Sequence, residues 1–357
     1  MSFILPTLPP QADLETKAIL KKVTSANRYL AELKGVSGTI PNQAILINTL
    51  SLQEAKDSSA IENIIATHDE MYKEELFPEY ASNAAAKEVQ NYAKALRKGF
   101  ELVSANRLLT VNHILTIQAE LEKNRAGLRK LPGTALVNDQ TGETVYTSPQ
   151  DERQIIDLMN NLETFINHDS FFDADPLVKM ALVHYQFESI HPFYDGNGRT
   201  GRIISVLYLV QKGLLDIPVF YLSRAIIRSK SEYYALLQKV RDRNAWEEWM
   251  LYLLDAIETT SKQTIRMIEE IRSAYEDYKN RIRAGCKFFS VDLLNNLFCH
   301  PYTRIEFLER DLQITRKTAS KYLDELSEKG FLVRHKLGKS YYFINVPLFE
   351  IFTRNWD

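Results

Sequence analysis

The sequence of 357 residues contains only two cysteines, Cys286 and Cys299, and they do not form a CxxC pair. Two isolated cysteines exclude a disulfide framework and fit a reducing compartment. No stretch approaches the ~18 consecutive apolar residues that a membrane-spanning helix needs, so we expect no contact with a membrane. The N-terminal run MSFILPTLPP has no basic start and is interrupted by prolines. We therefore expect no signal peptide and a cytoplasmic location.

The chain also lacks an excess of charge of one sign. Its formal net charge is −2, so any nucleic-acid-binding surface must be local. Apolar residues make up 45% and charged residues 25%, which is ordinary for a folded globular protein and gives no sign of disorder. The length is large for a single domain, and we expect two or three.

Apolar residues recur at helical spacing along most of the chain, so the predicted fold class is mainly α. Two segments break this pattern. Residues 134–147 contain two short strand-like runs around Asp139-Gln-Thr-Gly142, which indicates a β-hairpin. From residue 286 the order is helix, helix, helix and hairpin, with Leu337-Gly338-Lys339 as the turn. This order is typical of a small winged helix-turn-helix domain.

The predicted division of the chain follows from these segments. A helical N-terminal region (1–110) contains a helix at about 55–68. A core (111–255) includes the hairpin at 134–147. A helical linker (256–285) then leads to the winged-helix domain (286–357).

The run from His191 to Arg202, HPFYDGNGRTGR, carries the most chemical information. It places a base, a carboxylate, three glycines and two arginines between two predicted helices. Glycines allow tight turns and close approach of backbone N–H groups to a ligand, and the following helix directs its positive N-terminal end at the same point. Arg199 and Arg202 lie three residues apart and can project to one side. Together these features predict an anion site suited to a polyphosphate, and Asp195 adds an oxygen ligand suited to Mg²⁺.

A glycine-rich turn alone is usually only a turn, and a single histidine is usually structural. The complete run, however, resembles the Fic-family pattern HxFx[DE]GNGRxxR at every specified position. Fic proteins are adenylyltransferases that move AMP from ATP to a Ser, Thr or Tyr hydroxyl of a target protein or of themselves. The resemblance therefore implies a nucleotidyltransferase with a Fic-type helical core, ATP as substrate and Mg²⁺ as cofactor.

The resemblance also implies a role for each residue of the run. His191 would be the general base and Phe193 would anchor the loop in the core. Asp195 would hold Mg²⁺ between the α- and β-phosphates, and Arg199 and Arg202 would neutralise the β- and γ-phosphates. The expected ATP-binding set also contains Gly196, Asn197, Gly198, Thr200 and Gly201. In this set the Asn197 amide and the glycine backbone would bind phosphate.

Two further expectations concern the nucleotide. Related Doc-type kinases have lysine where this chain has Gly198, so glycine favours adenylyl transfer over transfer of the γ-phosphate. The motif contacts phosphates and does not select the base. Tyr234, with its neighbour Tyr233, is a candidate for an aromatic wall against adenine, although core positions within a helix explain these tyrosines equally well. The hairpin at 134–147 resembles the flap that aligns an extended target segment by strand addition, with an ordinary surface hairpin as the alternative.

Upstream, the run from Ser58 to Asn63 matches the inhibitory pattern [ST]xxxE[GN] of the same family. Ser58 and Glu62 are four residues apart and share one face of a helix. The resemblance implies that Glu62 pairs with Arg202 and holds ATP in a non-productive position. Taken alone, so short a pattern would describe a solvated glutamate.

The predicted recognition helix of the winged-helix domain begins at Ile314, and Leu323 and Leu326 face the core. Its N-terminal half and the wing carry basic or polar side chains that suit DNA: Arg316, Lys317, Ser320, Lys321, Arg334, Lys336 and Lys339. The acidic residues Asp311, Asp324, Glu325 and Glu328 weaken this field, and such folds also serve protein contacts. A nucleotide-sensing, DNA-binding regulator without transferase activity therefore stays open. Transfer of a different nucleotide, self-modification and a homodimer stay open as well.

Overall fold

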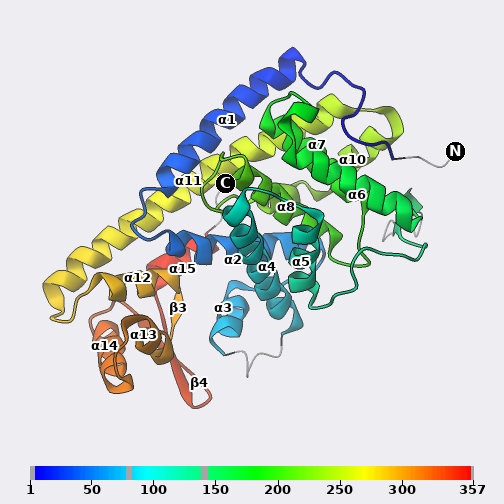
Figure 1. Cartoon of the computed structure of the whole chain (residues 1–357). Helices are drawn as coiled ribbons and strands as arrows, with labels where there is room; N and C mark the ends of the chain where they lie inside the picture. Colours follow the sequence, from blue (N-terminus) through cyan, green and yellow to red (C-terminus); the bar gives the residue numbers. More distant parts are fainter. Residues whose placement is uncertain (1–4, 78–82, 138–143, 355–357) are drawn as a thin grey trace.

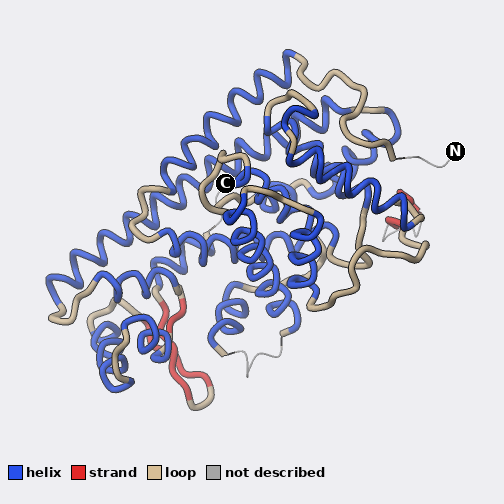
Figure 2. The backbone as a smooth tube through the Cα atoms, in the orientation of Figure 1, coloured by secondary structure: helices blue, strands red, loops and turns tan. Residues whose placement is uncertain are grey.

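The computed structural model describes residues 5–77, 83–137 and 144–354. These residues form a mainly helical molecule with two small antiparallel sheets, which confirms the predicted fold class (Figures 1 and 2). None of the helices in these ranges is long and apolar enough to cross a membrane. The helices are α1 (Lys17–Ser37), α2 (Gln43–Ile61), α3 (His68–Leu76), α4 (Ala84–Asn106), α5 (Val111–Glu122), α6 (Glu152–Asn167), the 3-10 helix η1 (Asp169–Phe171), α7 (Pro176–Ile190), α8 (Asn197–Gln211), α9 (Leu222–Arg228), α10 (Lys230–Arg243), α11 (Trp246–Gly285), α12 (Val291–Cys299), α13 (Ile305–Leu312), α14 (Arg316–Glu328) and α15 (Val346–Thr353).

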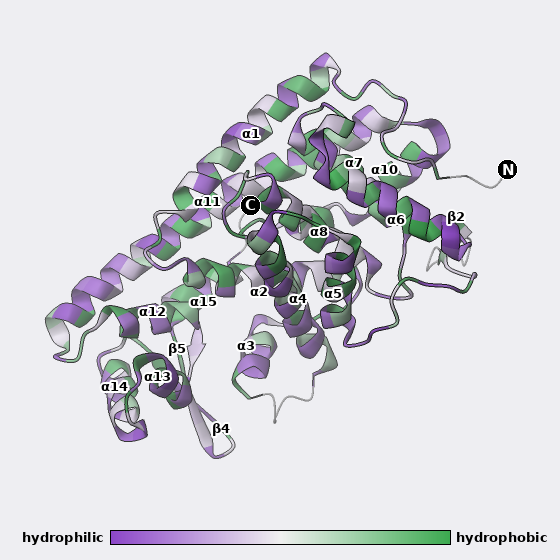
Figure 3. Ribbon diagram, in the orientation of Figure 1, coloured by the Kyte–Doolittle hydropathy of each residue, from purple (hydrophilic) through white to green (hydrophobic). Residues whose placement is uncertain are grey.

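The two helices around the motif form the centre of the molecule. The α7 helix begins with Asp175 as N-cap, whose carboxylate accepts the backbone N–H of Leu177 at 2.8 Å, and with Pro176 at its first position. Every residue of α7 after Pro176 is buried, as are most residues of α8. In contrast, outer helices such as α1 and α6 alternate between hydrophilic and hydrophobic residues (Figure 3).

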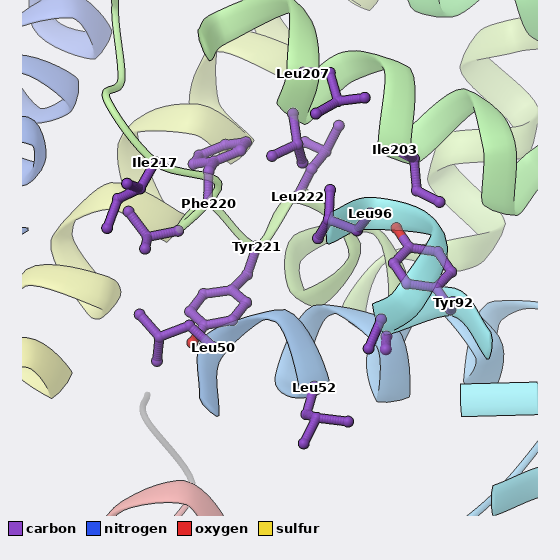
Figure 4. Close-up of a cluster of buried hydrophobic side chains, with 14 of the residues drawn as sticks. Leu50, Leu52, Tyr92, Leu96, Ile203, Leu207, Ile217, Phe220, Tyr221 and Leu222 are labelled. Carbon is purple, nitrogen blue, oxygen red and sulfur yellow. The ribbon is translucent and has the colours of Figure 1, made fainter. Parts of the chain in front are cut away.

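Apolar side chains from α2, α4 and α8 meet in a shared core (Figure 4). Leu50 of α2, Leu96 of α4 and Leu207 of α8 are fully buried there. Leu52 lies on the other side of α2 and points away from this cluster, yet it is also buried. Because α2 is covered on both sides, its position depends on the helices of this core and also on the residues that pack against its second side.

The predicted domain boundary at residue 255 falls inside α11, a single helix of 40 residues. Residues 256–285 are helical, and they continue a helix that begins in the core. The division of the chain into domains stays a prediction. The α11 helix runs beside α1 along one side of the molecule (Figure 1). Long packing between these two helices removes the need for a separate linker helix.

The predicted helix at about 55–68 is also wrong in its bounds. The α2 helix runs without interruption from Gln43 to Ile61, and Glu62 is its C-cap. Asn63 then adopts a left-handed conformation with φ 62°. Asparagine tolerates this conformation better than most residues and commonly ends helices, so it stops the helix here. His68 begins the next helix, α3, instead of ending this one.

The first sheet pairs β1 (Ala135–Val137) with β2 (Thr144–Thr147), at the predicted hairpin. The predicted turn residues 139–142 lie outside the described residues. The second sheet has the order β3-β5-β4, with β3 (Tyr302–Thr303), β4 (Val333–Leu337) and β5 (Ser340–Ile344). Together with α12 to α15 it makes up the C-terminal domain, residues 286–354. The three helices and the hairpin that were predicted occur here, and the assignment to the winged-helix class stays a prediction.

Candidate active site

The motif loop joins the end of α7 to the start of α8. His191 is the C-cap of α7 and has a left-handed backbone, with φ 50°. Asn197 closes the loop, because its side chain accepts the N–H of Phe193 at 2.8 Å and donates to the carbonyl of Phe193 at 2.9 Å. Phe193 is fully buried, as predicted. Both polar atoms of the Asn197 side chain thus help to hold the loop shape. Its contact with phosphate stays a prediction.

His191 lies in a cationic surrounding. Burial, with the nearby charges of Arg129 and Arg241, lowers the pKa of His191 from 6.5 to about 4, although the Glu188 backbone and Glu62 oppose this. Its Nδ1 is buried and has no hydrogen-bond partner among the described residues. The imidazole is therefore neutral at neutral pH and able to accept a proton.

Arg202 and Glu62 form an ion pair at the start of α8. Nη2 of Arg202 donates to Oε1 of Glu62 at 2.7 Å and to the Ser58 carbonyl at 3.0 Å. Nε donates to the Ser58 hydroxyl at 2.7 Å. The guanidinium is fully buried, so these contacts with the end of α2 satisfy donors that have no access to water. The structure thus brings together the two predicted sequence patterns, which are separated by more than a hundred residues.

Gly198 makes room for the carboxylate of Glu62. A Cβ atom at position 198 would clash with Oε1 of Glu62 and press on Nη1 of Arg202. The carboxylate therefore lies over the first turn of α8, where a phosphate would bind at a helix N-terminus. Burial alone would raise the pKa of Glu62, but Arg202, with Arg199 and Lys230, outweighs burial and holds this pKa below its usual value. Glu62 is accordingly ionised and behaves as an anion at an anion site.

Arg199 does not share its partners with Arg202. Its Nη1 contacts Glu88 of α4 at 2.8 Å and its Nη2 contacts Glu122 of α5 at 2.9 Å. In this structure Arg199 ties α8 to two neighbouring helices, while Arg202 contacts Glu62. The proposed contacts of both arginines with phosphates stay a prediction. Sequence reasoning could not find Glu88 or Glu122, because neither lies in a recognisable pattern.

Asp195 is exposed at the edge of the loop, and its Oδ1 accepts the N–H of Gly196 at 2.7 Å. Among the described residues no group of three or more His, Cys, Asp or Glu side chains could hold a metal ion. A single exposed carboxylate fits Mg²⁺ that is bound mainly by phosphates and water, since Mg²⁺ commonly uses one or two carboxylates in this way. It does not fit a site made by the protein alone.

The remaining predicted residues are two positions within α8 and the two tyrosines of α10. Gly201 and Thr200 are buried inside α8, and a Cβ atom at Gly201 would clash with a carboxylate oxygen of Glu188. Tyr233 is a buried core residue whose hydroxyl meets Nε2 of His184 at 2.8 Å. Tyr234 is 41% exposed and packs edge-on against Tyr233. Its proposed contact with adenine stays a prediction.

Glu188 is a charged residue of this site that sequence reasoning missed. It lies on the last turn of α7, and its Oε1 is buried with no hydrogen-bond partner in the part of the chain that the structure describes. Burial raises the pKa of Glu188 to about 7; Arg202 opposes this shift and Glu62 adds to it. The carboxyl is therefore close to its titration point while Glu62 occupies the site.

Arg129 is a second missed residue, and it connects the hairpin to the motif loop. It lies in the segment that joins α5 to β1, and its side chain is fully buried. Nε donates to the His191 carbonyl at 2.8 Å, and Nη2 donates to the Ser148 hydroxyl at 2.9 Å and to the Pro149 carbonyl. Its backbone N–H donates to the Pro192 carbonyl at 2.8 Å. Arg129 therefore fixes both the left-handed His191 and the segment that follows β2.

We expect Arg129→Met to lower the free energy of unfolding by about 3 kcal/mol. The substitution removes charge-assisted hydrogen bonds, each worth about 1.5–3 kcal/mol, and leaves buried carbonyls without donors. Urea unfolding followed by circular dichroism measures the change. Arg125→Met, at an exposed position of the same loop, is the matched control and should stay within about 0.5 kcal/mol of wild type. Equal losses in the two variants would contradict this role.

The basic side chains of the C-terminal domain are partly neutralised within the chain. Arg316 contacts Glu306 at 2.7 Å and Glu309 at 3.6 Å, and Arg334 contacts Asp324 at 3.2 Å. An open groove of about 980 Å³ runs along α14, and both basic and acidic side chains line it. A DNA contact here stays a prediction, and these ion pairs do not favour it.

Comparison with known proteins places this geometry in a family. Residues 20–101 match the model of the Fic/DOC family N-terminal region, and residues 108–209 match the Fic/DOC family model. Residues 275–348 match the C-terminal domain of SoFic-like protein adenylyltransferases. The chain therefore belongs to the Fic family.

Individual relatives are more distant. A probable protein adenylyltransferase of Aquifex aeolicus is 28% identical over 201 residues, which is 55% of this chain and 57% of that protein. A protein adenylyltransferase Fic of Aedes aegypti is 31% identical over 103 residues, 29% of this chain and 19% of that protein. A protein adenylyltransferase of Caenorhabditis elegans is 30% identical over 90 residues, 25% of this chain and 16% of that protein. Each match thus spans less than two thirds of the relative.

Solved structures agree on the fold. A Fic family protein from Desulfovibrio desulfuricans superposes with a TM-score of 0.60 at 19% identity, covering 94% of this chain and 98% of that chain. A Fic domain containing signaling protein from Bacteroides thetaiotaomicron gives 0.56 at 18% identity, covering 70% of this chain and 97% of that chain. At these identities the likeness concerns the fold alone.

Proposed function

We propose that this chain is a protein adenylyltransferase that moves AMP from ATP to a hydroxyl of a protein, and that Glu62 inhibits it. One observation carries the proposal: an ionised glutamate from α2 fills an anion site at the start of α8, beside a neutral His191. The names of the Fic relatives give the reaction class. The local geometry supports the roles proposed for the residues.

In this proposal the target hydroxyl attacks the α-phosphorus of ATP. Its proton passes to Nε2 of His191, the new bond joins the hydroxyl oxygen to the α-phosphorus, and the bond to the β-phosphate oxygen breaks to release pyrophosphate. A base with a lowered pKa is neutral at physiological pH and is already in the form that accepts a proton. Arg129 contributes by holding the backbone of His191.

The triphosphate would lie over the N-terminus of α8, with backbone N–H groups of the loop and Arg202 as its partners. Asp195 would hold Mg²⁺ together with phosphate oxygens, and the ion would supply charge neutralisation of the leaving pyrophosphate. Arg199 would act mainly by fixing α8 against α4 and α5.

Inhibition follows from competition for Arg202. The γ-phosphate and the carboxylate of Glu62 need the same guanidinium, and both cannot occupy the space above Gly198. ATP that binds while Glu62 stays in place would be displaced from the position required for in-line attack.

The target would dock at the hairpin. With two strands only, β1 and β2 each have an edge that a peptide can extend by strand addition. Tyr146 fixes the hairpin to α7 and α10. Its hydroxyl donates to the Ser189 carbonyl at 2.8 Å, and its ring lies 3.8 Å from the Arg241 guanidinium. A Ser, Thr or Tyr presented there, on a target or on this chain, would face His191.

The position of the transferred label tests the reaction class. We expect Glu62→Gly, incubated with Mg²⁺ and ATP labelled at the α-phosphate, to attach label to protein in a lysate or to itself. ATP labelled at the γ-phosphate should give none, because pyrophosphate leaves. Transfer of γ-label would make the protein a kinase. Absence of both labels from a variant that still binds ATP would favour a nucleotide sensor.

A further inference from the structure

The C-terminal domain packs directly on the inhibitory segment, defined as residues 43–76, which comprises α2, its connecting loop with Glu62, and α3. The α12 helix lies against α2, and β3 lies against α3. In Figure 1 the C-terminal domain follows α11 along the chain, and its last helix, α15, packs back against α11. The α2 helix thus contacts this domain through α12.

An aromatic cluster forms the centre of this contact. Tyr72 of α3 is almost fully buried, and its ring lies 5.2 Å from that of Tyr302 in β3 and 6.2 Å from that of Phe349 in α15. Phe77, directly after α3, lies 6.0 Å from Tyr342 in β5. Aromatic pairs at these separations pack favourably beyond the area they bury. The C-terminal domain thus supplies much of the environment of α3.

Polar contacts fix the register of the same surface. The Tyr302 hydroxyl donates to Oδ1 of Asp69 at 2.9 Å, and Nδ1 of His300 lies 3.4 Å from the Glu75 carboxylate without forming a hydrogen bond. Asp69 and Glu75 are at opposite ends of α3. The directional Tyr302–Asp69 hydrogen bond favours one position of α3 on the domain, which aromatic packing alone would not do.

Gln53 connects α2 to α3 through two side-chain contacts. Its Nε2 donates to the Tyr72 hydroxyl at 3.4 Å, and its Oε1 meets Nε2 of His68 at 2.9 Å. The next residue, Glu54, faces the catalytic core, where its carboxyl accepts the Tyr92 hydroxyl at 3.1 Å and both polar groups of Ser223. The α2 helix is therefore held between the core and the C-terminal domain. Glu62 lies on the same uninterrupted helix, at its C-cap.

We propose that the C-terminal domain holds the inhibitory segment in the position where Glu62 reaches Arg202, so that loosening its contact with α3 activates the enzyme. The inference rests on the proposed function and adds its regulation. Geometry gives the reason. A hydrogen bond of 2.7 Å is lost when its atoms separate by about 1 Å, and Oε1 of Glu62 lies close to where a Cβ atom at position 198 would stand. Tyr72, Tyr302 and Asp69 are then positioning residues for inhibition.

The test removes the contact from either side. Asp69→Ala acts on α3 and Tyr302→Ala on the C-terminal domain, with Tyr302→Phe as a milder form that deletes only the hydroxyl. Glu270→Ala is the matched control, because Glu270 contacts the same domain at Arg354 from α11, away from the inhibitory segment. Each variant is made in the full chain, alone and together with Glu62→Gly.

We expect Asp69→Ala and Tyr302→Ala to raise the rate of α-label transfer about 10-fold over wild type, with a smaller rise for Tyr302→Phe. In the Glu62→Gly background they should change nothing, because inhibition is already absent. Amide hydrogen exchange should become faster at residues 58–66 in Asp69→Ala and stay unchanged in Glu270→Ala. This readout does not depend on activity.

Three results would contradict a proposal, and each shows whether the regulatory inference or the proposed function is wrong. If Glu62→Gly is active but the interface variants keep the wild-type rate and wild-type exchange, the regulatory inference is wrong and the proposed function stands. The same conclusion follows if the interface variants alter the Glu62→Gly rate as much as the wild-type rate. If Glu62→Gly transfers no label, the proposed function fails and the inference falls with it.

Discussion

Glu62→Gly should raise the rate of AMP transfer by up to about 100-fold over wild type. A form that is active only about 1% of the time is held by about 2.7 kcal/mol, half of the ~5.5 kcal/mol that a full swing from 1:99 to 99:1 requires. A charge-assisted hydrogen bond contributes about 1.5–3 kcal/mol, which is the size needed. The Glu62–Arg202 pair has this character, since the arginine is buried and the contact is 2.7 Å long. Initial rates with α-labelled ATP at saturating Mg²⁺ measure the effect.

Glu62→Gln is the graded control for this experiment. The amide fills almost the same space above Gly198 and can still accept from Arg202, but it carries no charge. Its rate should fall between wild type and Glu62→Gly. A gain that appears in neither variant, although both bind ATP and fold, would mean that the ion pair does not limit the reaction.

The sequence predicted the local parts of the site because they are contiguous in the chain. The motif from His191 to Arg202 needs only two helices and the loop between them, and the structure places it at the junction of α7 and α8 as expected. The pairing of Glu62 with Arg202 was available as well, since the family pattern names both residues. The family and the mainly helical fold are confirmed by the comparisons.

What the sequence could not supply is the set of partners that the tertiary fold brings in. Arg129, Glu88 and Glu122 stand in segments without a motif, and nothing in their spacing marks them as neighbours of the loop. From the sequence alone, Asn197 could bind phosphate or hold the loop. Only the structure shows that its side-chain amide is bonded to the backbone of Phe193. Side-chain direction depends on packing, which a local pattern does not specify.

The ends of helices are hard to predict from local sequence for a related reason. The α1 helix continues through Gly35 to Ser37, because packing along α11 outweighs the low helix propensity of one glycine. Conversely, Asn63 ends α2 before the predicted helix end at about residue 68. This error matters for function, because the true end places Glu62 at a helix terminus, where a small shift of the following loop moves the carboxylate.

In the Glu62→Gly background, His191→Ala should reduce AMP transfer by about 10²–10⁴-fold, the usual contribution of a general base. ATP binding should change little, because the proposed phosphate contacts come from Arg202 and the N-terminus of α8. Single-turnover transfer and equilibrium binding of ATP, measured on the same variant, separate the two effects.

His191 is also the left-handed C-cap of α7, so alanine there could act through backbone strain instead of lost chemistry. His191→Asn distinguishes these causes, because asparagine tolerates the left-handed conformation and still cannot serve as the base. We expect both substitutions to reduce transfer to the same extent, with His113→Ala, at a histidine outside the site, as an unaffected control. Substantial activity in His191→Asn would mean that His191 shapes the loop, and the proton would then need another acceptor. Glu188 would be the candidate, because burial raises the pKa of this carboxyl to about 7.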